Sequence, residues 1–79
     1  MLDRVIAILT SILKIKIDEK SERKNILQWD SMQNLNIIMT LEEEFKIDIP
    51  MDCFKDLSSV KTIVEYLENQ NVLEKRKSI

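Results

Sequence analysis

A chain of 79 residues can form one domain with a modest core, but it is too short to wall a large enzyme cleft. Its residues are 44% hydrophobic and 33% charged, with a formal net charge of −2, which is a globular balance without an apolar run long enough to span a membrane. Histidine is absent and cysteine occurs once, which excludes Ser-His and Cys-His catalytic pairs, the usual zinc ligand sets and an internal disulfide.

The first predicted element is an amphipathic helix from about Leu2 to Lys16. Its apolar residues recur at three- and four-residue steps, which places them on one helical face: Leu2, Val5, Ile6, Leu9, Ile12 and Leu13. The same segment carries charged residues and lacks a small-residue cleavage site, so it does not have the form of a signal peptide, and we expect a cytoplasmic protein.

A polar connection follows from Asp18 to Asn25, and its lack of periodicity predicts a long surface loop. We expect three apolar residues after it, Ile26, Leu27 and Trp29, to fold this loop back onto the core. Because the chain has no glycine, we also expect left-handed turns to use Asn or Asp or to be avoided, which favours helices joined by ordinary loops.

The second predicted helix begins at Ser31. Asp30 is a favoured N-cap residue, and Gln33, three positions later, completes an approximate capping box. The apolar stripe of this helix is formed by Leu35, Ile38, Leu41 and Phe45. Its opposite, polar side is formed by Gln33, Asn36, Thr40 and Glu43.

A short segment, Lys46 to Ile49, alternates polar and apolar residues as a strand would. The chain has no second strand to pair with it, so we predict an extended loop. Pro50 then favours the first turn of a short helical piece that contains Cys53, Phe54 and Leu57. We interpret Cys53 as a small apolar core residue, with a reactive thiol as the alternative.

The last predicted helix is capped by Ser58 or Ser59 and runs to about Asn71, with an apolar face of Val60, Ile63, Val64 and Leu67. The sequence therefore predicts an all-α fold, a small antiparallel bundle of three main helices plus one short helix. We expect one domain over residues 1–71 and a frayed tail over residues 72–79.

The serine at the start of the second helix is the first candidate functional residue. At that position the Ser31 hydroxyl lies beside unpaired backbone N–H groups and the positive end of the helix dipole, where an attached phosphate would be stabilised. Asp30 could also help to hold a metal-bound phosphate donor during transfer. Helix-start serines are common, however, so geometry alone leaves both capping and modification open.

Charge is unevenly distributed along the chain. Residues 30–56 contain seven acids and two bases, a net charge of −5, whereas the remaining residues contain seven acids and ten bases, a net charge of +3. The acidic middle suits a basic protein partner and does not suit nucleic acid phosphates. A solvated helix face remains the alternative reading for each of Glu42, Glu43 and Glu44.

The residues LQWDSMQNLNIIMTLEEEFKIDIP, followed by LSSVKTIVEYLE, closely resemble the acyl carrier protein family. The resemblance covers about Leu27 to Glu68 and consists of an ordered series at family spacing: Asp30-Ser31-Met32, Leu41 to Phe45, Ile49-Pro50 and Ser59-Val60. It implies a non-catalytic four-helix carrier whose Ser31 receives 4′-phosphopantetheine from coenzyme A through a separate phosphopantetheinyl transferase. The thiol of that arm would carry an acyl or aminoacyl group as a thioester, loaded by a ligase and passed to downstream transferases.

The second helix is the usual docking surface of this family, and here the match is partial. Gln33 and Asn36 stand where fatty-acid carriers commonly have acids, and Gln28 replaces the family's glycine before the motif. The loss of early negative charge should weaken steering toward fatty-acid synthase enzymes. The Trp29-Asp30-Ser31 motif with a less acidic helix resembles the freestanding carriers of specialised pathways, and a carrier of fatty acids in lipid synthesis is the subordinate alternative. We expect a monomer. We expect the partner-binding residues to be Met32, Gln33, Asn36, Met39, Glu42 and Glu43.

Several alternatives stay open at this point. Met32 and Met39 could contact partners or pack in the bundle, and Trp29 could pin the loop to the core or lie beside the arm. A helical interaction adaptor with the same fold and no arm is the competing function. Retention of both Asp30 and Ser31 favours the carrier, since an adaptor would need only the Asp30 cap. A small enzyme is disfavoured because no acid-base pair or cleft is evident.

Overall fold

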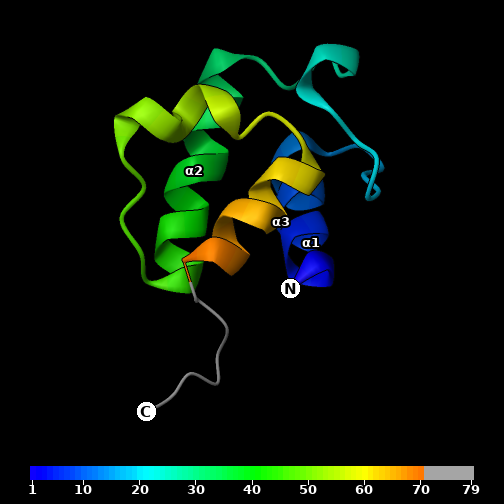
Figure 1. Cartoon of the computed structure of the whole chain (residues 1–79). Helices are drawn as coiled ribbons and strands as arrows, with labels where there is room; N and C mark the ends of the chain where they lie inside the picture. The colour runs from blue at the N-terminus through cyan, green and yellow to red at the C-terminus, as the bar shows by residue number, and fades with distance from the viewer. Residues whose placement is uncertain (71–79) are drawn as a thin grey trace.

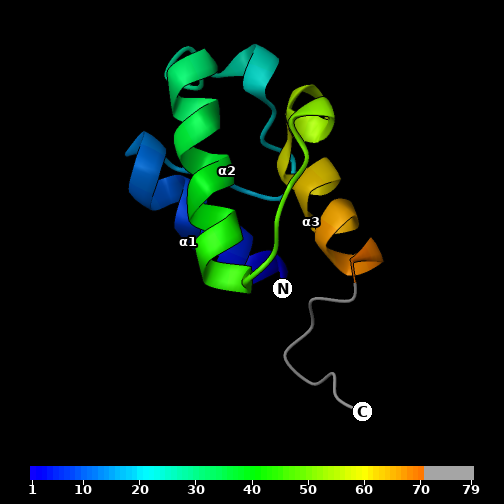
Figure 2. The same cartoon turned by 90° about the vertical axis from the view of Figure 1, so that its left-hand side faces the viewer.

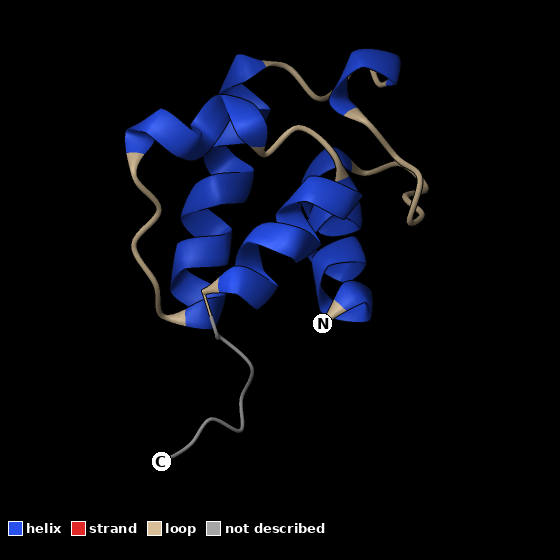
Figure 3. Ribbon diagram, viewed as in Figure 1, coloured by secondary structure: helices blue, strands red, loops and turns tan. Residues whose placement is uncertain are grey.

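The computed structural model describes residues 1–70, and within them every regular element is helical (Figures 1 and 3). The three main helices are α1 (Leu2–Leu13), α2 (Ser31–Phe45) and α3 (Val60–Asn69). Two short 3-10 helices, η1 (Arg23–Asn25) and η2 (Met51–Asp56), lie in the connections before and after α2. The predicted all-α fold of three main helices and one short helix is confirmed, with η1 as an additional turn in the first loop.

The core forms where α1 packs against both α2 and α3, with η2 against α2. Helices α1 and α2 run in opposite directions, and α3 crosses them (Figures 1 and 2). Buried apolar side chains come from all three helices and from the connections between them: Val5, Leu9, Leu13, Ile17, Trp29, Ile37, Ile38, Leu41, Phe45, Ile49, Leu57, Val60, Ile63 and Leu67. Within residues 1–70 no helix has the length and apolar character needed to cross a membrane.

The first helix is shorter than predicted: α1 ends at Leu13, whereas the sequence predicted an end at about Lys16. Lys14 takes the left-handed conformation, with φ of 59°, and its N–H donates to the Thr10 carbonyl. Lys46 ends α2 in the same way, with φ of 57°. The expectation that left-handed turns would use Asn or Asp was therefore wrong. In both cases an exposed lysine closes the helix, where its charge complements the negative end of the helix dipole.

The buried face of α2 differs from the predicted stripe. Leu35 is 45% exposed, whereas Asn34 and Ile37 are buried next to the correctly predicted Ile38. The core-facing register therefore includes a polar residue one turn before Ile38. Leu27 was also predicted wrongly, because its side chain is 95% exposed, while Trp29 two residues later is only 2% exposed and holds the loop on the core.

The connection after α2 is an extended loop, as predicted, and the side chain of its residue Ile49 is buried. Pro50 is the N-cap residue of η2 and so precedes the first turn, whereas the sequence predicted it within that turn. At the start of α3, Ser59 is the cap: its hydroxyl accepts from the Thr62 N–H at 3.0 Å, and the Thr62 hydroxyl accepts from the Ser59 N–H at 3.1 Å. Helix α3 ends at Asn69. The predicted helix end at Asn71, the domain boundary and the tail lie outside the described residues.

Cys53 on η2 is a free, partly buried thiol that packs against the core, as expected for a small apolar residue. Burial, followed by the influence of the Cys53 thiol and the Glu42 carboxylate, raises the pKa of Tyr66 on α3.

Candidate functional site

Ser31 is the first residue of α2, and its side chain is exposed. Asp30 caps the helix, because its Oδ1 accepts a hydrogen bond from the Gln33 N–H at 2.9 Å. The predicted capping box is only half formed: the Gln33 Oε1 accepts from the Asn36 side chain at 2.8 Å and does not return to Asp30. The Ser31 hydroxyl is consequently not used as the cap and remains available at the positive end of the helix.

A buried hydrogen-bond network holds the loop that precedes Ser31 and α2. The Trp29 indole Nε1–H donates to the Asn34 Oδ1 at 2.8 Å, and the Asn34 Nδ2–H donates to the Phe54 carbonyl at 3.3 Å. Asn34 therefore joins three segments, namely the loop before α2, α2 itself and η2. Because its polar atoms are paired on both sides, this amide is accommodated in an otherwise apolar interior.

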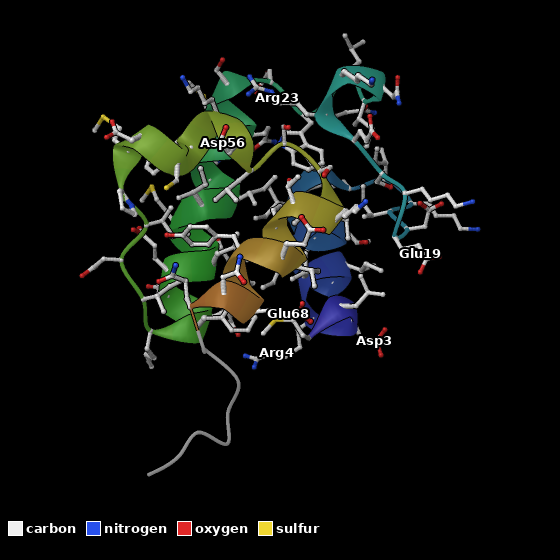
Figure 4. The ribbon with its side chains drawn as sticks, viewed as in Figure 1. Asp3, Arg4, Glu19, Arg23, Asp56 and Glu68 are labelled. Atoms are coloured by element: carbon white, nitrogen blue, oxygen red, sulfur yellow. The ribbon has the colours of Figure 1, made fainter. Side chains whose placement is uncertain are left out.

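Arg23 on η1 is the nearest cation to the candidate serine. Its Nη2 donates to the Ser31 Oγ at 3.1 Å, and its Nε donates to the Trp29 carbonyl at 3.1 Å. The backbone of η1 is held in turn by the start of α3, since the Arg23 N–H donates to the Ser58 carbonyl at 2.8 Å and Glu22 forms an isolated antiparallel bridge with Ser59. Figure 4 shows Arg23 at the end of the molecule where α2 begins.

The predicted partner-binding residues lie mostly on one groove. Five of the six line a cavity of about 720 Å³ between α2, the end of α1 and the loop after α2: Gln33, Asn36, Met39, Glu42 and Glu43. Met32 does not line this cavity but lies one helical turn before Asn36. Its side chain is 74% exposed and that of Met39 is 56% exposed, so packing of either methionine inside the bundle is excluded.

The three consecutive glutamates of α2 have different environments. Glu42 uses its carboxylate within the chain, accepting from the Ile49 N–H at 2.8 Å, and so fixes the loop after α2. Glu44 pairs with Arg4 of α1 at 3.3 Å, and the Arg4 guanidinium also stacks on the Phe45 ring. Arg4 lies at the opposite end of the molecule from Arg23 (Figure 4). Glu43 is exposed and has no ion pair with another residue among residues 1–70.

Two comparisons with known proteins bear on the family of this chain. Residues 3–67 match the family described as the phosphopantetheine attachment site. The chain is also 40% identical to an acyl carrier protein of Campylobacter hominis over 57 residues, which cover 72% of this chain and 70% of that protein. The chain belongs to the acyl carrier protein family. It is thus a non-catalytic carrier with a domain for phosphopantetheine attachment, modified by a transferase and served by partner enzymes.

Sequence reasoning missed two side chains near Ser31 of this carrier. Arg23 and Lys55 line a cavity of about 240 Å³ together with Ser31, Asn34, Leu35 and Phe54. Neither cation belongs to a recognisable sequence pattern, because their proximity to Ser31 depends on how η1 and η2 fold against α2. No group of three or more potential metal-ligating side chains is found in residues 1–70, and the expectation that no metal is bound stays a prediction.

Proposed function

We propose that Ser31 is the residue of this carrier that bears 4′-phosphopantetheine. The observation that supports it is an exposed hydroxyl at the start of α2 that is not needed for capping and that contacts the Arg23 guanidinium. The surroundings fit a phosphodiester, because the first backbone N–H groups of α2 and a nearby arginine both favour negative charge. We also assign Asp30 two roles, as the cap and as a carboxylate that supports the metal-bound donor during transfer.

The chain itself supplies the attacking oxygen. In transfer from coenzyme A the Ser31 oxygen forms a bond to the phosphorus of the phosphopantetheine unit, the bond from that phosphorus to the adenosine bisphosphate breaks, and the serine proton passes to the transferase. When bound, the group supplies a thiol that holds an acyl or aminoacyl cargo as a thioester. A tethered arm then presents the cargo to successive enzymes at high effective concentration.

The proposed partners are a phosphopantetheinyl transferase, a ligase that loads the cargo and downstream transferases of a specialised biosynthetic pathway. The groove along α2 supports this, because it presents amides and an exposed methionine before its acids: Gln33, Asn36, Met39, Glu42 and Glu43. Such a surface is less acidic at its start than one built for strongly basic synthase patches. We further propose that the carrier acts as a cytoplasmic monomer and does not bind nucleic acid.

Intact mass spectrometry tests the attachment. Purified protein is incubated with coenzyme A, magnesium and a broad-specificity phosphopantetheinyl transferase, and the modified peptide is then fragmented. We expect a gain of one phosphopantetheine, located on Ser31. Modification at another serine would overturn the assignment of the site. No gain with several transferases, on protein shown to be folded, would favour the interaction adaptor.

Reversing the charge of Glu43 tests the docking surface. Glu43→Lys is expected to slow loading or transfer by about 3- to 10-fold at low salt, because an exposed acid on the groove steers basic partners, and the difference should shrink at high salt. Glu65→Lys, an equal charge change at an exposed position on α3, serves as the control. Equal rates for both variants with several partner enzymes would remove Glu43 from the interface.

A further inference from the structure

Arg23 is held in place before any group is attached to Ser31. Its backbone N–H donates to the Ser58 carbonyl, and its Nε donates to the Trp29 carbonyl at 3.1 Å, so the side chain is fixed at both ends. The residue is partly buried, and the other hydrogen bond of its side chain is the one that the Nη2–H donates to the Ser31 Oγ at 3.1 Å. The guanidinium is thus directed at the oxygen to which the arm would be attached, and little side-chain freedom is left to lose.

Attachment of a phosphate changes what this guanidinium can contact. An ester oxygen is a weaker acceptor than a hydroxyl, whereas the two free phosphate oxygens carry the negative charge and lie two bonds beyond the Ser31 Oγ, on the phosphorus. Because Arg23 is already at hydrogen-bond distance from the Ser31 Oγ, its donors can reach those oxygens after a small side-chain adjustment. Arginine donors to phosphate form short, charge-assisted and often bidentate hydrogen bonds.

The cavity beside Ser31 has a chemistry that fits the beginning of the arm. Its volume is about 240 Å³, and its lining combines two cations, Arg23 and Lys55, with apolar side chains of Leu35 and Phe54. In phosphopantetheine the phosphodiester is followed by one methylene and then by a quaternary carbon that carries two methyl groups. A cationic end next to an apolar wall therefore matches an anion followed by a branched alkyl group.

We propose that Arg23 binds the phosphodiester of the arm and places the first part of the arm over the cavity lined by Leu35, Phe54 and Lys55. This inference rests on the proposed attachment at Ser31. Arg23 acts here as a positioning residue, because it orients the group and takes no part in bond formation. The arm would then leave α2 on the side of η2, away from the groove lined by Asn36, Met39 and Glu43.

The test compares Arg23→Gln and Arg23→Lys with Lys24→Gln, in the unmodified and loaded forms. Lys24 belongs to the same short turn, is exposed, and forms only a surface ion pair with Glu22 at 3.5 Å, so its substitution removes one charge without touching Ser31. Intact mass reports loading. The 31P resonance of the phosphodiester, at low and high salt, and the Tm gained on loading report the contact.

Wild type and Lys24→Gln should share one 31P shift, and Arg23→Gln should differ from both at low salt. The increase in Tm on loading should be about 2–4 °C smaller for Arg23→Gln than for the wild type. Arg23→Lys should fall in between, because lysine keeps the charge but cannot form the bidentate hydrogen bonds of a guanidinium group. Loading with identical 31P shifts and Tm gains in all variants would overturn the role of Arg23 alone. No mass gain on folded wild type would overturn this inference together with the attachment at Ser31.

Discussion

Ser31→Ala is expected to abolish loading completely while leaving helix content almost unchanged. The variant removes the only oxygen proposed to accept the phosphopantetheine unit. The cap of α2 stays intact, because the Gln33 N–H bonds to Asp30 and not to Ser31. The lost hydrogen bond from Arg23 is exposed and should lower the free energy of unfolding by no more than about 1 kcal/mol. Intact mass and far-ultraviolet circular dichroism measure the two effects separately.

Ser58→Ala is the matched control for that experiment. Ser58 is a partly buried serine whose backbone carbonyl, not its side chain, accepts from the Arg23 N–H, so the substitution leaves the contacts of Ser31 in place. It should be loaded like the wild type. A loaded Ser31→Ala protein would exclude Ser31 as the site, and a large loss of helix in that variant would show that Asp30 does not cap α2 alone.

Trp29→Ala is expected to cause the largest loss of stability. The side chain is 2% exposed, and its indole N–H bonds to the buried Asn34 amide at 2.8 Å. Truncation leaves a cavity and an unpaired acceptor, which together cost about 3–5 kcal/mol. A domain of this size has a total stability of about 5–10 kcal/mol, so the Tm should fall by well over ~10 °C. Thermal and urea unfolding measure the change.

Leu27→Ala provides the comparison for the tryptophan variant. Leu27 is a large apolar residue in the same loop, but it is 95% exposed, so its truncation should change the free energy of unfolding by less than about 0.5 kcal/mol. Trp29→Phe should fall between the two, because it keeps an aromatic ring and loses the hydrogen bond to Asn34. If Trp29→Ala and Leu27→Ala had equal stabilities, Trp29 would not hold the loop on the core.

The periodic parts of the chain were predicted well from sequence. Val5, Leu9 and Leu13 on α1 and Val60 and Ile63 on α3 are buried as their three- and four-residue spacing indicated. Both helices have one continuous apolar face that packs on a single core, so period alone determines which residues are inside. The start of α2 was equally predictable, because the preference of aspartate for the N-cap position is local.

The wrong predictions concern residues whose burial or position is determined by tertiary contacts. In α2, Leu35 fits a helical period and is exposed, whereas Asn34 is buried because Trp29 and the Phe54 carbonyl supply its partners. One signal was present, since Ile37 and Ile38 lie three and four residues after Asn34, on the same face. Arg23 gave no such signal, because its place beside Ser31 depends on contacts with a segment 35 residues later in the chain, Ser58.

The hydrogen bond between Trp29 and the Asn34 amide also gives the protein an intrinsic fluorescence probe of this region. Trp29 is the single tryptophan of the sequence, and its indole N–H ends a hydrogen-bonded chain that passes through Asn34 to the backbone of η2. A displacement of η2 that breaks the 3.3 Å hydrogen bond from Asn34 to the Phe54 carbonyl would alter the polarity around the indole. Fluorescence emission of the unlabelled protein is therefore expected to change when η2 moves relative to α2.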